Sequence, residues 1–207
     1  MDLKGIKNII FDLGGVIINI DHQLAFSAFQ HLLGNKFDAL EKQLLHENIL
    51  ERYETAAITT DEFVSFFQAY NSGLTEQSII NAWNSMLLEI PKERMDLIIH
   101  LTKKYRVFLL SNTNEIHLKF INEYVREHFG LWSVSEPFEK AYYSNEMKLR
   151  KPNAEIFKQV LDVSKLLPKE TLFIDDTEEH IITAKQLNLK THHLLSDETI
   201  LDLFDED

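Results

Sequence analysis

The chain has 207 residues, of which 44% are hydrophobic and 26% charged, a composition typical of a soluble globular protein with a sizeable core. Its 33 acidic residues outnumber the 21 basic ones, and the formal charge of −12 argues against binding to nucleic acid or to an anionic membrane. It contains no cysteine, which excludes disulfides and thiol chemistry, and we expect a cytoplasmic protein. The first residues, MDLKGIKNII, do not resemble a signal peptide.

The first predicted strand ends in an aspartate followed by glycines. Residues 7–20 read KNIIFDLGGVIINI, and the apolar run Ile9–Phe11 leads directly into Asp12. A short apolar run bounded by glycine is typical of a buried strand in a parallel sheet, and ligands bind beyond the carboxyl ends of such strands. The alternative is that Asp12 only caps a turn. The segment 16–20 is predicted to continue as a short extended hairpin.

The region from His22 to Glu89 is predicted to be a helical insertion. Apolar residues recur three and four positions apart, which indicates three to four helices, with starts near Thr60 and Glu76. The many phenylalanines of this region are expected to form its core rather than a cofactor site.

Strands and helices then alternate to the end of the chain. Strands are predicted at 107–110, 141–143, 172–174 and 191–195, and helices at 91–104, 115–129, 153–166 and 178–187, with a short fraying helix in the acidic tail 196–207. Gly130 is placed to end the second of these helices. This alternation predicts an α/β fold with a parallel sheet and right-handed crossovers, whose strand order stays open.

Polar residues follow three of the apolar strands. Asp12, Ser111-Asn112 and Asp175-Asp176 would meet at one edge of a parallel sheet, with Lys151 nearby. Clustered carboxylates repel one another unless a cation lies between them, and an all-oxygen set suits Mg²⁺. The alternatives are that the aspartate pair caps the following helix and that Lys151 is an ordinary surface lysine.

The motifs FDLGGVI, LLSNTN, RKP and FIDD occur in this order, with the helical insertion after the first. In this the chain resembles the haloacid dehalogenase superfamily, in its phosphatase branch with a helical cap. The motifs are most similar to those of small bacterial sugar-phosphate phosphatases, including α-glucose-1-phosphate phosphatases. The resemblance implies a Rossmann-like, three-layer α/β core of residues 1–20 and 91–207, with an all-helical cap of residues 21–90.

The resemblance also implies roles for the residues that match the motifs. Asp12 would be the nucleophile that forms an aspartyl-phosphate. Lys151 would neutralise the charge of the phosphoryl group, which Ser111 and Asn112 would also bind. The implied Mg²⁺ ligands are the Asp12 carboxylate, the Gly14 carbonyl, Asp176, and Asp175 either directly or through water.

One position departs from the family pattern. Many related phosphatases carry a second aspartate two residues after the nucleophile as general acid and base, but here that residue is Gly14. Metal binding is unaffected because only the carbonyl of that residue is used. Another residue would have to protonate the leaving group, and Asp21, His22 and Glu54 are candidates for this proton donor.

The sequence therefore predicts a Mg²⁺-dependent phosphomonoesterase acting on a small phosphorylated metabolite, such as the sugar phosphate glucose 1-phosphate. The alternatives are a 2-haloacid dehalogenase, which would need no metal, a phosphomutase, and a non-catalytic phosphate-binding or interaction protein. No nucleic-acid or membrane partner is expected, and the oligomeric state stays open.

Overall fold

The computed structural model describes residues 3–204 and contains a sheet of parallel strands in the order β3-β2-β1-β4-β5. The strands are β1 (Asn8–Phe11), β2 (Arg106–Ser111), β3 (Lys140–Tyr143), β4 (Thr171–Asp175) and β5 (Lys190–His193). The predicted parallel α/β fold is confirmed. The strand order, which the sequence left open, places β1 in the centre, with Phe11 paired with Leu109 of β2 and with Ile174 of β4.

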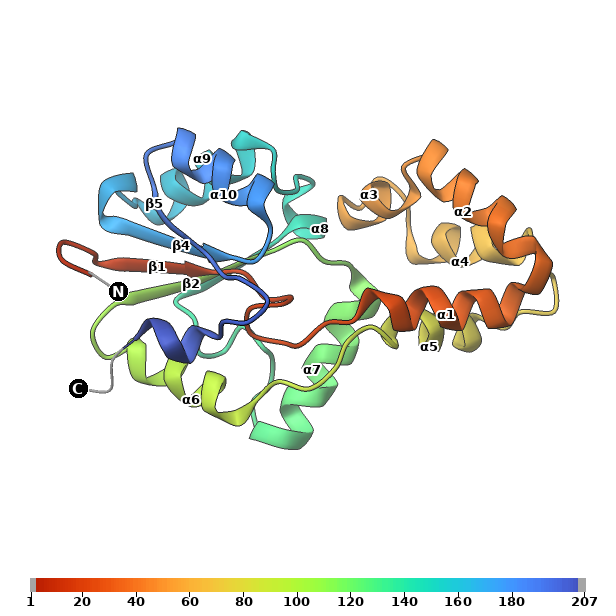
Figure 1. The fold of residues 1–207 in the computed structure, drawn as a ribbon, viewed down its shortest axis with the longest axis horizontal. Helices are drawn as coiled ribbons and strands as arrows, with labels where there is room; N and C mark the ends of the chain where they lie inside the picture. Colours follow the sequence, from red (N-terminus) through yellow and green to blue (C-terminus); the bar gives the residue numbers. More distant parts are fainter. Residues whose placement is uncertain (1–2, 205–207) are drawn as a thin grey trace.

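Helices cover both faces of this sheet and make a three-layer core (Figure 1). One face carries α6 (Lys92–Leu101), α7 (Glu115–Phe129) and the 3-10 helix η3 (Ile200–Leu203); the other carries α9 (Ala154–Ser164) and α10 (Glu178–Gln186). Residues alternate along β1, so Ile9 and Phe11 pack on the first face and Ile10 on the second. The shorter helices α8 (Ser144–Met147) and η2 (Pro168–Glu170) lie in loops. Gly130 ends α7 at a φ of +70°, as predicted.

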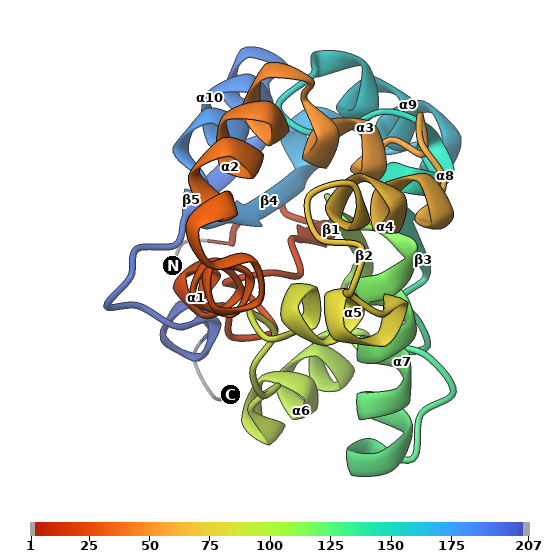
Figure 2. The ribbon, with the colours of Figure 1, turned by 90° about the vertical axis from the view of Figure 1, so that its right-hand side faces the viewer.

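The insertion forms a separate helical lobe beyond the carboxyl ends of the strands (Figures 1 and 2). We call this lobe the cap. The residues from 21 to 90 hold five α-helices, where three to four were predicted: α1 (His22–Leu33), α2 (Phe37–His46), α3 (Ile49–Glu54), α4 (Thr60–Gln68) and α5 (Glu76–Asn84), with a 3-10 turn at Gly34–Lys36. Left-handed backbone at Asn48 and Ala56 divides the middle of the lobe into more pieces than periodicity indicated.

The starts of α4 and α5 and the aromatic core of the cap agree with the predictions. Thr59 accepts a hydrogen bond from the Glu62 backbone N–H in a capping box, and Thr75 caps α5. Phe63 stacks on Tyr53 at 4.2 Å between ring centroids and lies 5.5 Å from Trp83. These rings therefore fill the interior of the lobe.

The two connections between core and cap run side by side. Ile20 forms an antiparallel bridge with Leu87, and Asn19 exchanges backbone hydrogen bonds of 2.9 and 3.0 Å with Leu88 and Glu89. Where an extended hairpin was predicted for residues 16–20, the chain instead makes a tight turn over residues 13–18, in which the Gly15 N–H donates to the Ile18 carbonyl at 2.9 Å. The extended residues of the first connection pair with the second connection because both must leave the core at the same place.

The tail forms a 3-10 helix rather than an α-helix, and Phe204 packs against Phe11 with ring centroids 6.2 Å apart. The last part of the predicted tail helix, residues 205–207, lies outside the described residues. Within residues 3–204 no helix has both the length and the apolar composition required to span a bilayer.

Candidate active site

The central position of β1 brings three strand ends together. Asp12 follows β1, Ser111 ends β2 and Asp175 ends β4, so all three residues lie at the sheet edge that faces the cap (Figure 1). The Asp12 backbone N–H donates to the Ile174 carbonyl at 2.9 Å, which extends the β1–β4 pairing to the aspartate itself. All three side chains are buried. The sheet thus assembles the residues that the strand-end pattern predicted to meet.

Three carboxylates and one lysine form the centre of the site. Asp12, Asp175 and Asp176 each offer an oxygen, and these oxygens lie within 4.8 Å of one another. The fully buried Lys151 Nζ donates to Asp12 Oδ1 at 2.7 Å, to Asp175 Oδ2 at 2.6 Å and to the Leu110 carbonyl at 2.9 Å. The alternative of Lys151 as a surface lysine is therefore wrong.

The carboxyl groups of this cluster titrate differently. Burial raises the pKa of Asp12 to about 7, and the charge of Asp175 acts in the same direction against the attraction of Lys151. Burial also opposes ionisation of Asp175, but Lys151 and His180 hold its pKa at about 2. Burial and the neighbouring Asp175 raise the pKa of Asp176. One lysine does not compensate for the two buried carboxylates and the exposed Asp176 beside them, which is the electrostatic setting of a cation site.

Asp175 is held by donors on several sides. His180, in the first turn of α10, donates from Nδ1 to both carboxylate oxygens at 2.9 and 3.0 Å, and the Thr177 backbone N–H donates to Oδ1 at 2.8 Å. With Lys151 on Oδ2, both Asp175 oxygens already have partners. Asp175 therefore orients Lys151, while Asp12 and Asp176 have fewer donors around them.

The Asn112 side chain holds the backbone of Lys151. Its Nδ2 donates to the Lys151 carbonyl and its Oδ1 accepts from the Lys151 N–H, both at 2.9 Å. Ser111 Oγ donates to the Asn112 carbonyl at 3.3 Å. Ser144 supports the same loop, since its Oγ accepts from the Thr113 N–H and donates to the Thr113 carbonyl. Asn112 thus fixes the lysine to the end of β2.

Two glycines leave space for neighbouring side chains. A Cβ at Gly15, whose φ is +70°, would lie 2.1 Å from Asp176 Oδ2. A Cβ at Gly14 would lie 2.5 Å from Ile20 Cδ1. Gly15 therefore permits Asp176 to approach the β1 loop, and Ile20 occupies the space that a side chain at residue 14 would need.

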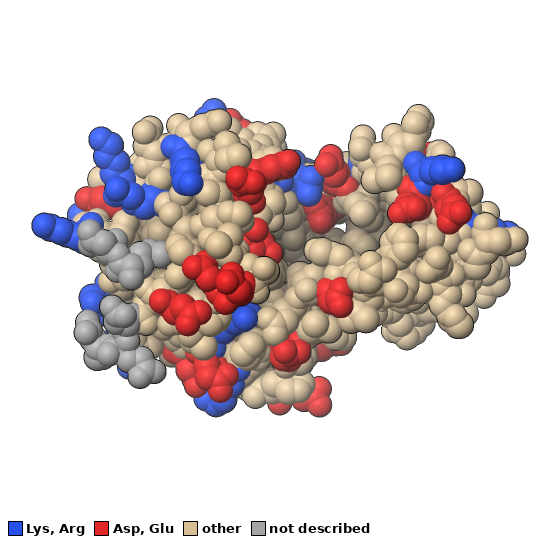
Figure 3. Space-filling view, in the orientation of Figure 1, with Lys and Arg blue, Asp and Glu red and all other residues tan. Residues whose placement is uncertain are grey.

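The cap contacts the core beside this site. Arg150, next to Lys151, donates from Nε to Glu54 and from Nη1 to Glu51, each at 2.8 Å. Figure 3 shows acidic and basic side chains side by side at the neck between the two lobes. On another side of the joint, His117 of α7 stacks on Trp83 of α5 with ring centroids 4.8 Å apart. Both contacts join helices of the cap to loops or helices that carry the site.

A cavity of about 350 Å³ lies among the cap helices and reaches the core at Asn112 and His117. Its wall is mainly apolar and comes from α1 to α5, and its polar lining residues are His22, Glu41, Glu54, Asn112 and His117. Burial lowers the pKa of His117 to about 4, and its Nε2–H donates to the Trp83 carbonyl. His117 is thus a neutral structural residue, which leaves His22, Glu41, Glu54 and Asn112 as the polar groups facing this space.

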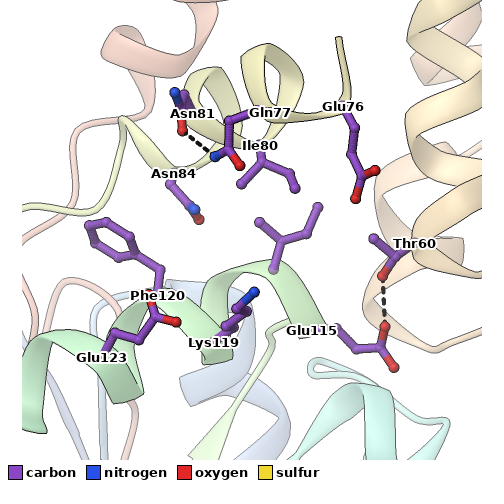
Figure 4. A pocket seen from close by; sticks show the side chains of 11 residues that line it. Thr60, Glu76, Gln77, Ile80, Asn81, Asn84, Glu115, Lys119, Phe120 and Glu123 are labelled. Atoms are coloured by element: carbon purple, nitrogen blue, oxygen red, sulfur yellow. Dashed lines mark hydrogen bonds between the residues drawn. The ribbon is translucent and has the colours of Figure 1, made fainter.

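A second hollow, of about 480 Å³, lies between α5 and α7 (Figure 4). Glu76, Asn84 and Lys119 line it, and Glu115 accepts a hydrogen bond from Thr60 at its rim. None of the carboxylates of the cluster, and neither Ser111 nor Lys151, lines this hollow. It is separate from the candidate active site.

Comparison with known proteins agrees with this geometry. Residues 6–188 match the model of the haloacid dehalogenase-like hydrolases. The chain belongs to this family. It is 33% identical over 198 residues to the D-ribitol-5-phosphate phosphatase of Bacteroides thetaiotaomicron, and the match covers 90% of each protein.

Solved structures of related hydrolases share the whole fold. A haloacid dehalogenase family enzyme of B. thetaiotaomicron has a TM-score of 0.90 and 36% identity, covering 98% of this chain and 100% of its own. Its complex with magnesium and inorganic phosphate has a TM-score of 0.86 and 37% identity, with 97% and 100% coverage. A predicted hydrolase of Porphyromonas gingivalis has a TM-score of 0.85 and 32% identity, covering 98% and 99%.

Several residues of this hydrolase site were not found from the sequence. His180 and Arg150 each hold a site residue but do not stand at a strand end, and Ser144 directly follows β3, whose sequence KAYY is a weaker apolar run than those of β1, β2 and β4. His180 has a weak local signal, because a residue one turn after a strand-end aspartate faces back toward it. The contacts of Ser144 and Arg150 join segments 31 and 96 residues apart, so their partners cannot be predicted from the local sequence.

Proposed function

We propose that this hydrolase is a Mg²⁺-dependent phosphomonoesterase that acts on a sugar phosphate or sugar-alcohol phosphate. The observation that carries the proposal is the cluster of Asp12, Asp175 and Asp176 around the buried Lys151. Supporting evidence comes from two relatives: one is a D-ribitol-5-phosphate phosphatase, and another was solved with magnesium and inorganic phosphate.

The donor set fits Mg²⁺. Oxygen ligands about 2.1 Å from one ion lie at most about 4.2 Å apart, so a cluster within 4.8 Å needs to close only slightly. Asp12 and Asp176 would hold the ion with the Gly14 carbonyl, and Asp175 would act directly or through water. When bound, the ion supplies positive charge that neutralises the phosphoryl oxygens and the carboxylates.

Each of the site residues has its own role in the proposed reaction. Asp12 attacks phosphorus, and the ester oxygen leaves with its electron pair as the aspartyl-phosphate forms. Lys151 and the Ser111 hydroxyl bind the phosphoryl oxygens, while Asn112 keeps Lys151 in place through its backbone. Water then attacks the aspartyl-phosphate, which releases phosphate and restores Asp12. Such a reaction depends mainly on positioning and charge neutralisation.

The substrate is proposed from the chemistry and the relatives together. D-ribitol 5-phosphate, on which the 33% identical relative acts, is favoured over the glucose 1-phosphate predicted from the sequence. Either ester would place its phosphate at Asp12 and its carbon chain in the cavity below the cap.

A phosphatase assay with and without Mg²⁺ tests the proposal. The panel contains D-ribitol 5-phosphate, glucose 1-phosphate, glucose 6-phosphate and p-nitrophenyl phosphate. We expect chelation by EDTA to abolish turnover, Mg²⁺ to restore it, and Ca²⁺ to support it poorly because Ca²⁺ prefers longer bonds and more ligands. Full activity in excess EDTA would refute the metal assignment and favour a dehalogenase-type reaction.

A further inference from the structure

The loop after Asp12 lacks a group that protonates a leaving alcohol. Gly14 has no side chain, and Ile20 fills the space beside it. Asp21 is exposed, and its carboxylate accepts a hydrogen bond of 2.9 Å from the Gln23 N–H at the start of α1. General acid catalysis is typically worth about 10²–10⁴-fold, so an alkyl phosphatase needs another source for this proton.

Glu54 is the cap carboxyl that the structure holds beside the site. It ends α3 and lines the cavity together with Asn112. Its side chain is only 20% exposed, and Arg150 Nε donates to its Oε2 at 2.8 Å. Because Arg150 immediately precedes Lys151, this bond fixes Glu54 relative to the lysine that would bind phosphate.

The surroundings of Glu54 raise its pKa above the ordinary value of a glutamate. Burial raises its pKa and the charge of Glu51 adds to this, while Arg150 and Lys151 act in the opposite direction. His22 also lines the cavity, but it is exposed, and within residues 3–204 no hydrogen bond holds its side chain. Glu54 is therefore the better-positioned proton donor of the two.

On the basis of the proposed phosphatase function, we propose that Glu54 is the general acid and base of this enzyme and that the cap supplies it. As Asp12 bonds to phosphorus, the ester P–O bond breaks and its electron pair passes to the leaving oxygen, which takes the proton of Glu54. The Glu54 carboxylate then takes a proton from the attacking water, and the electron pair of the breaking acyl-phosphate bond returns to Asp12. One ester and one water give one alcohol and one phosphate.

This assignment makes the chemistry depend on cap closure. Glu54 belongs to the cap, whereas Asp12 and Lys151 belong to the core, so the proton reaches the leaving group only while the cap is seated. The Arg150–Glu54 pair spans the two lobes and sets this position.

Comparison of two leaving groups in one variant tests the proposal. Glu54→Gln keeps an oxygen for Arg150 but has no proton to transfer. The substrates are p-nitrophenyl phosphate, whose leaving group is far more acidic than an alkyl alcohol and leaves as the phenolate, and the faster of D-ribitol 5-phosphate and glucose 6-phosphate. We expect kcat at saturating Mg²⁺ to fall about 10²–10⁴-fold on the alkyl phosphate and less than about tenfold on the aryl phosphate.

Glu51→Gln is the matched control, because Glu51 lies on the same helix and pairs with the same arginine but is 59% exposed. We expect it to change both rates less than about threefold. Equal losses on both substrates in Glu54→Gln would overturn the assignment, since that residue would then act only through cap position. A leaving-group-selective loss in His22→Gln but not in Glu54→Gln would also overturn it.

Assays of the wild-type enzyme on aryl and alkyl phosphates distinguish a wrong assignment of Glu54 from a wrong proposed function. Cleavage of p-nitrophenyl phosphate without cleavage of either alkyl phosphate would overturn the role of Glu54, because such an enzyme has no working acid. Absence of Mg²⁺-dependent hydrolysis on every phosphate ester would instead overturn the phosphatase function itself.

Discussion

Comparison of the variants Gly15→Ala and Gly130→Ala should distinguish the cost of backbone strain from the cost of displacing Asp176 in the proposed metal site. The residue has a φ of +70°, and an added Cβ would lie 2.1 Å from Asp176 Oδ2, where an ordinary contact begins at 3.4 Å. The carboxylate oxygen must therefore retreat by about 1.3 Å, and a misplacement of about 1 Å in an active site can cost about 10²-fold in rate. The unfavourable backbone adds about 1–2 kcal/mol of destabilisation.

Gly130→Ala is a matched control for this change. Gly130 has the same φ of +70°, ends α7, and has no atom within 4 Å of an added Cβ. Both variants should lose about 1–2 kcal/mol in urea unfolding. Only Gly15→Ala should lose kcat by about 10²-fold or more and need more Mg²⁺ for half-maximal rate. If Gly15→Ala stays within tenfold of Gly130→Ala in activity, the proposed role of Asp176 is wrong.

Other variants test the nucleophile, the lysine and the cap joint. Asp12→Asn should lower kcat by far more than tenfold, that is by much more than about 1.4 kcal/mol of barrier stabilisation, while a circular dichroism spectrum like that of the wild type shows that it folds. Lys151→Ala should abolish turnover and destabilise by about 3–5 kcal/mol because it leaves the buried Asp12 without its partner and removes a cation from Asp175, whereas the variant Lys148→Ala, at an exposed lysine, should do neither; similar small effects in both would contradict the assignment. His117, with a folded pKa of about 4 against 6.5, stabilises the protein fully above pH 6.5 and loses this contribution, about 3 kcal/mol, as pH falls toward 4. Urea unfolding at pH 7.5 and pH 4 should show this loss in the wild type, and an equal loss in His117→Gln would refute it.

The sequence predicted the parts of the site that depend on local pattern. Apolar runs that stop at Asp12, Ser111 and Asp175 identified the strands, and parallel strands must end at one edge. The order of the strands could not be predicted in this way, because hydrophobic periodicity says nothing about which strands are neighbours. The end of α3 near Ala56 could not be predicted either, because this alanine adopts a φ of +50°, which is unfavourable for a residue with a Cβ.

The features of the site that the sequence could not predict depend on contacts between distant segments. Asn112 was predicted to bind phosphate, and the structure shows its side chain bound to the backbone of Lys151, 39 residues away. The pairing of Glu54 with Arg150 depends equally on how the cap sits on the core. Such contacts follow from packing of the finished fold and have no signature in either segment alone.

The central position of β1 has a consequence for how the chain folds during synthesis. Asn8 of β1 bonds to Thr171 of β4, a residue 163 positions later. At ribosomal rates of about 5–20 residues per second, β1 waits about 8–33 s for this neighbour. The cap is continuous in sequence, so its helices can pack during that interval. The apolar strand NIIF meanwhile has an unpaired edge, which exposes it to aggregation until β4 is made.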